Sequence, residues 1–176
     1  MRIEVADTAS LNPSTLASAR SLLDDAFAGT FTDDDWEHSV GGAHVLAWDD
    51  AQLVGHASVV ARRLLVGTIW LRAGYCEALA VSASHRGRRI GALLMDEVER
   101  ITATGFDFGA LSTTALADDF YRRRGWTRWL GTTWAMTPAG RTRTDDDDGG
   151  IWVRPGTAPL DVSEELTCDQ RAGDPW

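Results

Sequence analysis

Hydrophobic and polar positions along this chain follow the two-residue period of strands in some segments and the period of a helix face in others. Residues 2–6 alternate as a short strand, and residues 12–29 predict a helix with an asparagine cap and a proline in its first turn. Residues 32–35, a threonine followed by three aspartates, are typical of a second helix start. Residues 44–50 and 51–66 are apolar and β-branched and meet at two aspartates, so we expect an antiparallel hairpin.

The remaining pattern decides the fold class. We expect strands at 68–81, 106–114, 126–137 and 151–155, and helices at 89–105 and 115–125, with a polar stretch before the last strand and an irregular tail after it. One strand–helix–strand unit among antiparallel segments predicts an α/β (α+β) fold, with a mixed, mostly antiparallel sheet and helices on both faces. No repeat or long linker divides the chain, so we expect a single domain over residues 1–176.

The charged residues narrow the chemistry. The chain has 176 residues and a formal net charge of −9, and all 17 of its basic residues are arginine. The absence of lysine excludes Schiff-base chemistry and the lysine-containing phosphate loop. Phosphate backbones repel an acidic chain, so we expect no nucleic-acid partner and favour a cationic one.

The cysteines and the hydropathy pattern bear on location. Cys76 and Cys168 are far apart and show no metal-ligand spacing, so we expect neither a disulfide framework nor a metal site. No apolar run approaches the roughly 20 residues of a membrane helix, and the first ten residues lack a secretory apolar segment. We therefore expect a cytoplasmic protein with no membrane partner.

The most informative segment runs from Tyr75 to Met95. An apolar strand ends in a turn with three arginines at positions 86–89, which leads into an amphipathic helix. Free backbone N–H groups at a helix start form an anion site, and arginines beside them strengthen it. Such arginines oppose the helix dipole unless an anion neutralises them. We therefore favour a diphosphate ligand over the alternative, a solvated charged turn.

This segment resembles the pyrophosphate loop of the GCN5-related N-acetyltransferases, whose usual pattern is Gln/Arg-x-x-Gly-x-Gly/Ala. Arg86 and Gly91 match the pattern, while Arg89 stands in place of its middle glycine. We expect Arg89 to be accommodated if its side chain points outward and its backbone stays helical.

The resemblance is closer still to aminoglycoside 2′-N-acetyltransferases. The similar blocks are FAGTFTDDDWEH, GYCEALAV, HRGRRIGALL, GALSTTALADDFYRRRGW, TRTDDDDG and CDQRAGDPW, which extend from about Phe27 to Trp176. This resemblance implies that the protein transfers acetyl from acetyl-coenzyme A (acetyl-CoA) to the 2′-amine of an aminoglycoside, without a metal. It also implies that the strand ending near Val81 splays from the strand at 110–112, so that pantetheine pairs with exposed strand backbone. The implied cofactor-binding residues are Leu79, Val81, Arg86, Gly87, Arg88, Gly91 and Ala92.

Two residues are candidates for the proton transfers of this reaction. Glu77, just before the loop, would accept the amine proton through water; the alternative is a structural partner for an arginine. Tyr121 lies where this superfamily often has a tyrosine that protonates the thiolate, although its spacing from Leu116 and Phe120 also fits ordinary packing. Cys76 is the rival nucleophile, but Cys76 and Glu77 cannot both face the substrate unless the strand contains a bulge, and no residue is placed to activate the thiol. We therefore expect a buried thiol and direct transfer in a ternary complex.

An aminoglycoside carries several ammonium groups, so its pocket should gather carboxylates. The substrate-binding residues implied by the resemblance are Asp35, Glu77, Ser112, Asp147, Asp174 and Trp176. Asp147 lies in a run of four aspartates, so its register is open by one residue. Thr30 and Ala78 stand where the family has an acid and a glycine, which leaves the drug spectrum open.

Other polar and aromatic residues receive structural interpretations. We interpret Asp33 and Asp34 as caps of the second helix. Trp70, Trp126 and Trp134 lie in strand patterns and are expected in the core. The four histidines show no ligand spacing, and no role is assigned to them.

Two other functions remain open. The first is an acetyltransferase of the same fold that acts on a polyamine, a metabolite amine or a protein N-terminus, because these acceptors are also cationic. The second function is that of a non-catalytic aminoglycoside-binding protein, against which the presence of Glu77, Arg86 and Tyr121 argues. The family is commonly dimeric, so the resemblance also implies a homodimer, for which the sequence itself carries no interface signature.

Overall fold

The computed structural model describes residues Met1–Trp176. Contacts between residues divide the chain into two compact units, Met1–Val60 with Cys76–Ile101 and Ala61–Tyr75 with Thr102–Trp176. No helix combines the length and the apolarity that crossing a bilayer requires. The long strands β3 (Gln52–Val66) and β4 (Ile69–Val81) contribute residues to both units.

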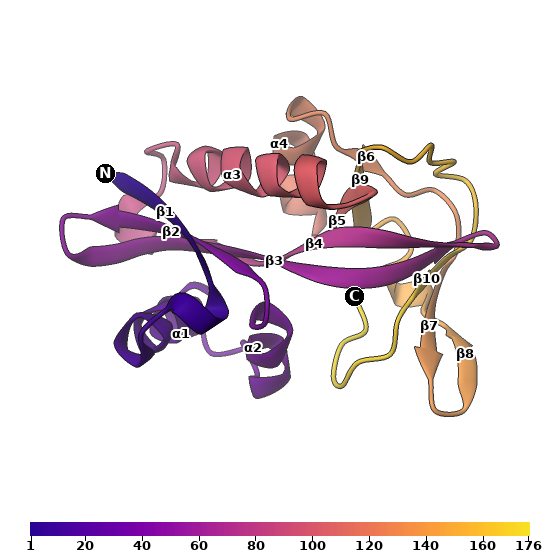
Figure 1. Cartoon of the computed structure of the whole chain (residues 1–176), viewed down its shortest axis with the longest axis horizontal. Helices are drawn as coiled ribbons and strands as arrows, with labels where there is room; N and C mark the ends of the chain where they lie inside the picture. The colour runs from indigo at the N-terminus through magenta and orange to yellow at the C-terminus, as the bar shows by residue number, and fades with distance from the viewer. The chain divides into compact units, whose positions relative to one another are not determined.

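The first unit is a sheet with helices on both faces (Figure 1). Its strands β1 (Arg2–Asp7) and β2 (Ala43–Asp49) pair antiparallel, and β2 continues into β3 through the predicted hairpin. Two helices, α1 (Pro13–Ala26) and α2 (Asp33–Ser39), lie on one face, and α3, which begins at Ile90 and ends at Gly105, lies on the other. Short 3-10 helices occupy Thr8–Ser10 and Ala83–His85.

The two helix starts confirm the cap predictions and correct one detail. Asn12 accepts a hydrogen bond from the Thr15 N–H at 2.8 Å, as expected of a cap. Thr32 caps α2, and the residue that completes the capping box is Asp35, whose Oδ2 accepts from the Thr32 N–H at 2.8 Å. Asp33 and Asp34 lie in the first turn of α2, as the capping interpretation expects, and the Asp33 carboxylate also pairs with Arg20 at 3.0 Å.

Apolar side chains fill both sides of the first unit's sheet. Leu22 and Leu23 of α1 pack in one cluster with Leu46, Leu53 and Ala80 from the strands. On the opposite face α3 approaches so closely that a Cβ on Gly55 would lie 3.0 Å from the Ile90 side chain. This burial holds the end of β4 and the start of α3 in place.

The second unit is a mixed sheet in the order β6-β9-β5-β4-β3-β10-β7-β8. Its further elements are β5 (Phe108–Ser112), the 3-10 helix Ala115–Ala117, α4 (Asp118–Arg123), β6 (Thr127–Arg128), β7 (Thr133–Thr137), β8 (Gly140–Arg143), the 3-10 helix Asp145–Asp147, β9 (Ile151–Pro155) and β10 (Leu166–Cys168). Strand β5 pairs in parallel with β4 only at Ala73–Tyr75, although β4 itself runs on to Val81.

Four predictions about the second unit are wrong. Residues 126–137 form two strands, because the chain turns at Gly131, where a Cβ would lie 1.8 Å from the Glu164 carbonyl oxygen. The polar segment contains β8, and the tail contains β10, which gains its hydrogen bonds from β3 and β7. Trp126 is buried as expected, but Trp70 is 44% exposed.

Candidate active site

The turn between β4 and α3 has the backbone of an anion-binding loop. Gly87 and Arg89 adopt left-handed conformations, with φ of +76° and +62°. The N–H groups of Gly87, Arg88 and Arg89 make none of the hydrogen bonds that close the turn and cap the helix. Amides of this kind beside a helix start attract an anion.

Gly91 lies at the start of α3, beside this loop. Its φ is not left-handed, and a Cβ built on it would meet only Val81, at an ordinary 3.9 Å. The folded chain therefore leaves open space at this position. The N–H of Ala92 is less available to bind an anion, because it donates to the Arg89 carbonyl at 3.1 Å.

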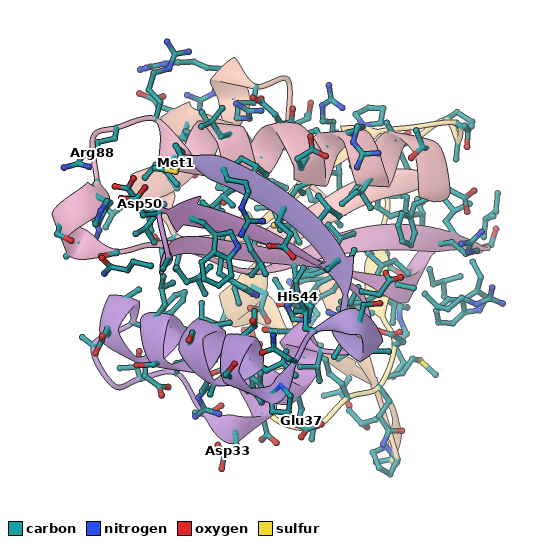
Figure 2. The ribbon with its side chains drawn as sticks, turned by 60° about the vertical axis from the view of Figure 1, so that its left-hand side comes forward. Met1, Asp33, Glu37, His44, Asp50 and Arg88 are labelled. Carbon is teal, nitrogen blue, oxygen red and sulfur yellow. The ribbon has the colours of Figure 1, made fainter.

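The arginines of the loop differ in their contacts. The Arg86 Nε donates to the Val81 carbonyl at 3.3 Å, and Arg88 lies 3.7 Å from an Asp49 carboxylate oxygen and projects outward (Figure 2). Arg89 is exposed, as expected, but its backbone is not right-handed helical. That expectation is wrong, because residue 89 keeps the left-handed geometry that a glycine adopts easily.

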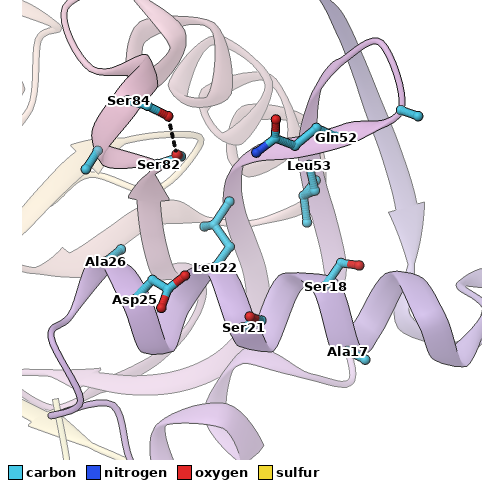
Figure 3. Close-up of a pocket in the computed structure, with 12 residues that line it drawn as sticks. Ala17, Ser18, Ser21, Leu22, Asp25, Ala26, Gln52, Leu53, Ser82 and Ser84 are labelled. Carbon is cyan, nitrogen blue, oxygen red and sulfur yellow. Dashed lines mark hydrogen bonds between the residues drawn. The ribbon is translucent and has the colours of Figure 1, made fainter.

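A hollow of about 1000 Å³ opens near the loop, between α1 and the segment Ser82–Ser84 (Figure 3). Its polar lining comes from serines, Gln52 and Asp25. None of these residues is an arginine, so the lining differs in charge from the loop.

The candidate base Glu77 lies on β4, where the strand is irregular. Glu77 is half-buried, and Ala78 after it has a left-handed φ of +50°, which costs a non-glycine residue about 1 kcal/mol. Ala78 thus holds a conformation that a glycine adopts at lower cost. Leu79 follows on the same strand and is half-buried.

Cys76 has the properties of a structural thiol. It is 6% exposed, and burial raises its pKa far above the usual value, so the reactive thiolate is suppressed. Burial likewise raises the pKa of Cys168 to about 11. These properties support direct transfer over an acetyl-cysteine intermediate.

The second unit gathers an acidic cluster around the chain's last residues. The Trp176 indole donates to the Thr144 hydroxyl at 2.9 Å, and its backbone N–H donates to an Asp174 carboxylate oxygen at 3.0 Å. Asp147 is hydrogen-bonded to Thr144, and burial first, then the charge of Asp174, raise its pKa above the usual value. Paired carboxylates with a raised pKa are suited to a cationic ligand.

The last two aspartates of the run have different surroundings. Asp148 accepts from the Thr133 N–H and hydroxyl, both at 2.9 Å, and pairs with Arg143. Arg143 holds the pKa of Asp148 below its usual value. Asp148 is therefore structural, which leaves Asp147 beside Asp174.

Two arginines that the sequence analysis missed hold this cluster. Arg62 is 5% exposed, donates to Asp169 at 2.9 Å and to the Pro175 carbonyl at 2.8 Å, and lies over the Tyr75 ring. Arg171 donates to the Asp174 and Trp176 carbonyls at 2.9 and 2.7 Å. An arginine at an inward position of the apolar segment 51–66 was the available signal for Arg62.

Ser112 and Tyr121 lie elsewhere in the second unit. Ser112 is exposed at the end of β5. Tyr121 is 6% exposed and packs edge-on against Phe120 and Trp126, with ring centroids 5.2 and 6.1 Å apart. The structure therefore agrees with ordinary packing of the ring, and the role of the Tyr121 hydroxyl as a general acid stays a prediction.

The chain matches the model of a family described as an acetyltransferase (GNAT) domain over residues 7–129. It belongs to the GNAT acetyltransferase family. The chain is also 43% identical over 173 residues to an aminoglycoside 2′-N-acetyltransferase of Mycolicibacterium fortuitum, with 96% of this chain and 89% of that protein covered.

Solved structures agree on the fold. A GNAT family acetyltransferase from Brucella melitensis, solved with acetyl-CoA, has a TM-score of 0.61 at 14% identity, over 94% of both chains. Eis1 from Mycobacterium abscessus has a TM-score of 0.61 at 18% identity, over 75% of this chain and only 33% of that longer chain. The predicted fold class, a mixed sheet with helices on both faces and a splayed strand pair, is confirmed.

Proposed function

We propose that this protein transfers the acetyl group of acetyl-CoA to the 2′-amine of aminoglycosides by direct transfer in a ternary complex. The observation that carries the proposal is the 43% identity to an aminoglycoside 2′-N-acetyltransferase over nearly the whole chain. Two features support it independently: an arginine-bearing amide loop suited to a diphosphate, and an acidic cluster suited to a polycation.

In this proposal the loop residues Arg86, Gly87, Arg88 and Gly91 hold the pyrophosphate, and the backbone of Leu79 and Val81 pairs with pantetheine. Ala92 contributes through the start of α3, its own N–H being used within the helix. The carboxylates of Asp147 and Asp174, the end of the chain at Trp176, and Asp35 and Ser112 contact the aminoglycoside.

The chemistry requires three proton movements. Glu77 removes one proton from the ammonium group through water, and the neutral amine nitrogen forms a bond to the acetyl carbon. The carbon–sulfur bond then breaks as Tyr121 donates its proton to the leaving thiolate, and the second proton of the attacking nitrogen returns to the Tyr121 oxygen, so the products are an amide, free coenzyme A and the proton held by Glu77.

The direct test measures thiol release from acetyl-CoA with a panel of amines. Two aminoglycosides that differ in an amine or a hydroxyl at the 2′ position are the matched pair, and we expect release with the amine alone. Release with a polyamine or a peptide N-terminus at a comparable rate would favour another acceptor. Tight aminoglycoside binding without any release would indicate a binding protein and contradict the proposal.

Asp147→Asn should weaken aminoglycoside binding and stabilise the fold at the same time. The raised pKa of Asp147 means that its carboxylate is less favourable in the folded chain than in the unfolded chain. Removing the charge should therefore raise the unfolding temperature at neutral pH, and the gain should vanish as pH falls and the carboxyl is protonated. Loss of a charged contact should raise the aminoglycoside KM about 10-fold.

Asp146→Asn is the matched control, since Asp146 lies in the same run and is exposed. It should change neither the KM nor the unfolding temperature. If Asp147→Asn lowers the unfolding temperature and leaves the KM unchanged, Asp147 is a structural residue.

A further inference from the structure

Two buried histidines of the first unit form a continuous hydrogen-bonded chain. His44 on β2 and His56 on β3 are fully buried, and Figure 2 shows His44 in the interior of the unit. The His44 Nδ1 lies 2.9 Å from the His56 Nε2, and the His56 Nδ1 lies 3.0 Å from the Ala78 carbonyl oxygen. At the other end, the His44 Nε2 lies 2.8 Å from the Thr8 hydroxyl.

The direction of this chain follows from its last acceptor. A carbonyl oxygen only accepts, so the His56 Nδ1 carries the hydrogen. Burial lowers the pKa of His56 to about 4 and lowers that of His44, so both rings are neutral. The His56 Nε2 must then accept from the His44 Nδ1, which leaves the His44 Nε2 as an acceptor for the Thr8 hydroxyl. That hydroxyl lies 2.8 Å from the His44 Nε2 and 3.2 Å from the Gly42 carbonyl oxygen, so its single hydrogen has the ring nitrogen as the nearer acceptor. The Thr8 oxygen in turn accepts from the N–H of exposed Gly41 at 2.9 Å.

The hydrogen-bonded chain ends at the Ala78 carbonyl, where β4 departs from regular geometry. Ala78 has a left-handed backbone and lies between Glu77 and Leu79, the residues to which we assign proton removal and pantetheine pairing. Rotating the peptide after Ala78 would move its carbonyl away from His56 and would change the direction of the Leu79 N–H. A buried donor at this carbonyl therefore selects one orientation of the irregular backbone.

We propose that His44 and His56 are positioning residues for acetyl transfer, which hold the Ala78 carbonyl and thereby fix the backbone that carries Glu77 and Leu79. This inference rests on the proposed function for its kinetic consequences. Its structural part, two neutral rings in defined tautomers, stands independently of any substrate.

The kinetic test compares two substitutions at His56. His56→Leu removes the donor to the Ala78 carbonyl, whereas His56→Asn keeps an N–H near the position of Nδ1. We expect kcat to fall about 10- to 100-fold in His56→Leu, with the aminoglycoside KM changed less than about threefold, and to be largely restored in His56→Asn. Ala78→Gly combined with His56→Leu should recover part of the lost kcat, because glycine adopts a positive φ without a holding contact.

A matched control separates positioning from lost stability. Val98→Ala truncates a fully buried side chain of the same unit, on α3 and outside the cluster against which Ala78 packs, and should lower the unfolding temperature without the selective loss of kcat. Equal kcat loss in Val98→Ala and His56→Leu at matched stability, or kcat retained in His56→Leu, overturns the inference. A parent protein without thiol release contradicts the proposed function instead.

The structural part is tested by nitrogen-15 NMR of the histidine rings in the parent protein alone. We expect both rings to be neutral and protonated at Nδ1 at neutral pH, and His56 to remain neutral down to about pH 5. A His56 ring protonated at Nε2, or one that titrates near its ordinary pKa, contradicts the hydrogen-bonded chain.

Discussion

Glu77→Gln should lower kcat about 100-fold or more and leave the affinity for acetyl-CoA unchanged. Glutamine has nearly the same shape as glutamate, so the half-buried side chain should still fit beside the irregular backbone at Ala78. It lacks the basic oxygen, and a positioned general base contributes about 10²- to 10⁴-fold to such a rate. Steady-state kinetics over a range of pH, with calorimetry of coenzyme A binding, measures both effects.

The pH profile distinguishes a base from a binding group. In the parent, kcat/KM should rise with pH as the essential base and the amine lose protons, and the contribution of the base should disappear in Glu77→Gln. Glu37→Gln, which changes an exposed glutamate of α2, should leave the rate and its profile unchanged. An unaltered pH profile in Glu77→Gln, with only a raised aminoglycoside KM, would limit Glu77 to substrate binding.

Tyr121→Phe should slow the chemical step about 100-fold while the protein stays folded. The ring is buried against Phe120 and Trp126, and phenylalanine retains these contacts. Phenylalanine lacks the hydroxyl proton that the departing thiolate needs. A positioned general acid contributes about 10²- to 10⁴-fold to the rate of such a step. Single-turnover measurement of coenzyme A release isolates this step from product dissociation.

Trp126→Phe provides the matched comparison for Tyr121. It loosens the same aromatic cluster and keeps the Tyr121 hydroxyl, so it should cost stability with a smaller change in the single-turnover rate. If the two variants slow the reaction equally, the contribution of Tyr121 is packing. A parent-like rate in Tyr121→Phe would exclude the general-acid role.

Local patterns predicted most of the elements, and their failures have a common physical cause. The caps at Asn12 and Thr32 and the hairpin between β2 and β3 depend on neighbours in sequence, and the structure confirms them. Strand β10 depends on hydrogen bonds from two distant strands, so its three residues carried no local signal. Trp70 fits a strand pattern, yet apolar residues in strands are not all inward-facing, and it is 44% exposed.

The sequence likewise indicated those parts of the candidate site that are contiguous, and not those that depend on distant residues. The arginine-rich turn and its glycines are contiguous, so sequence alone indicated an anion site there. The partners of Asp147 are Thr144 and Asp174, and the clamp on the last residues comes from Arg62, which is far from them in sequence. The histidines showed no ligand spacing because they bond to each other and to a backbone carbonyl across strands.

The sequence by itself determined the family, the amide loop and the acidic character of the chain, because these reside in contiguous motifs and in composition. Only the tertiary structure decided which aspartate of the run is structural, which residues accept a left-handed backbone, and which buried groups hold them. Those outcomes depend on contacts between residues remote in sequence, since burial and hydrogen-bond partners arise only when strands pair.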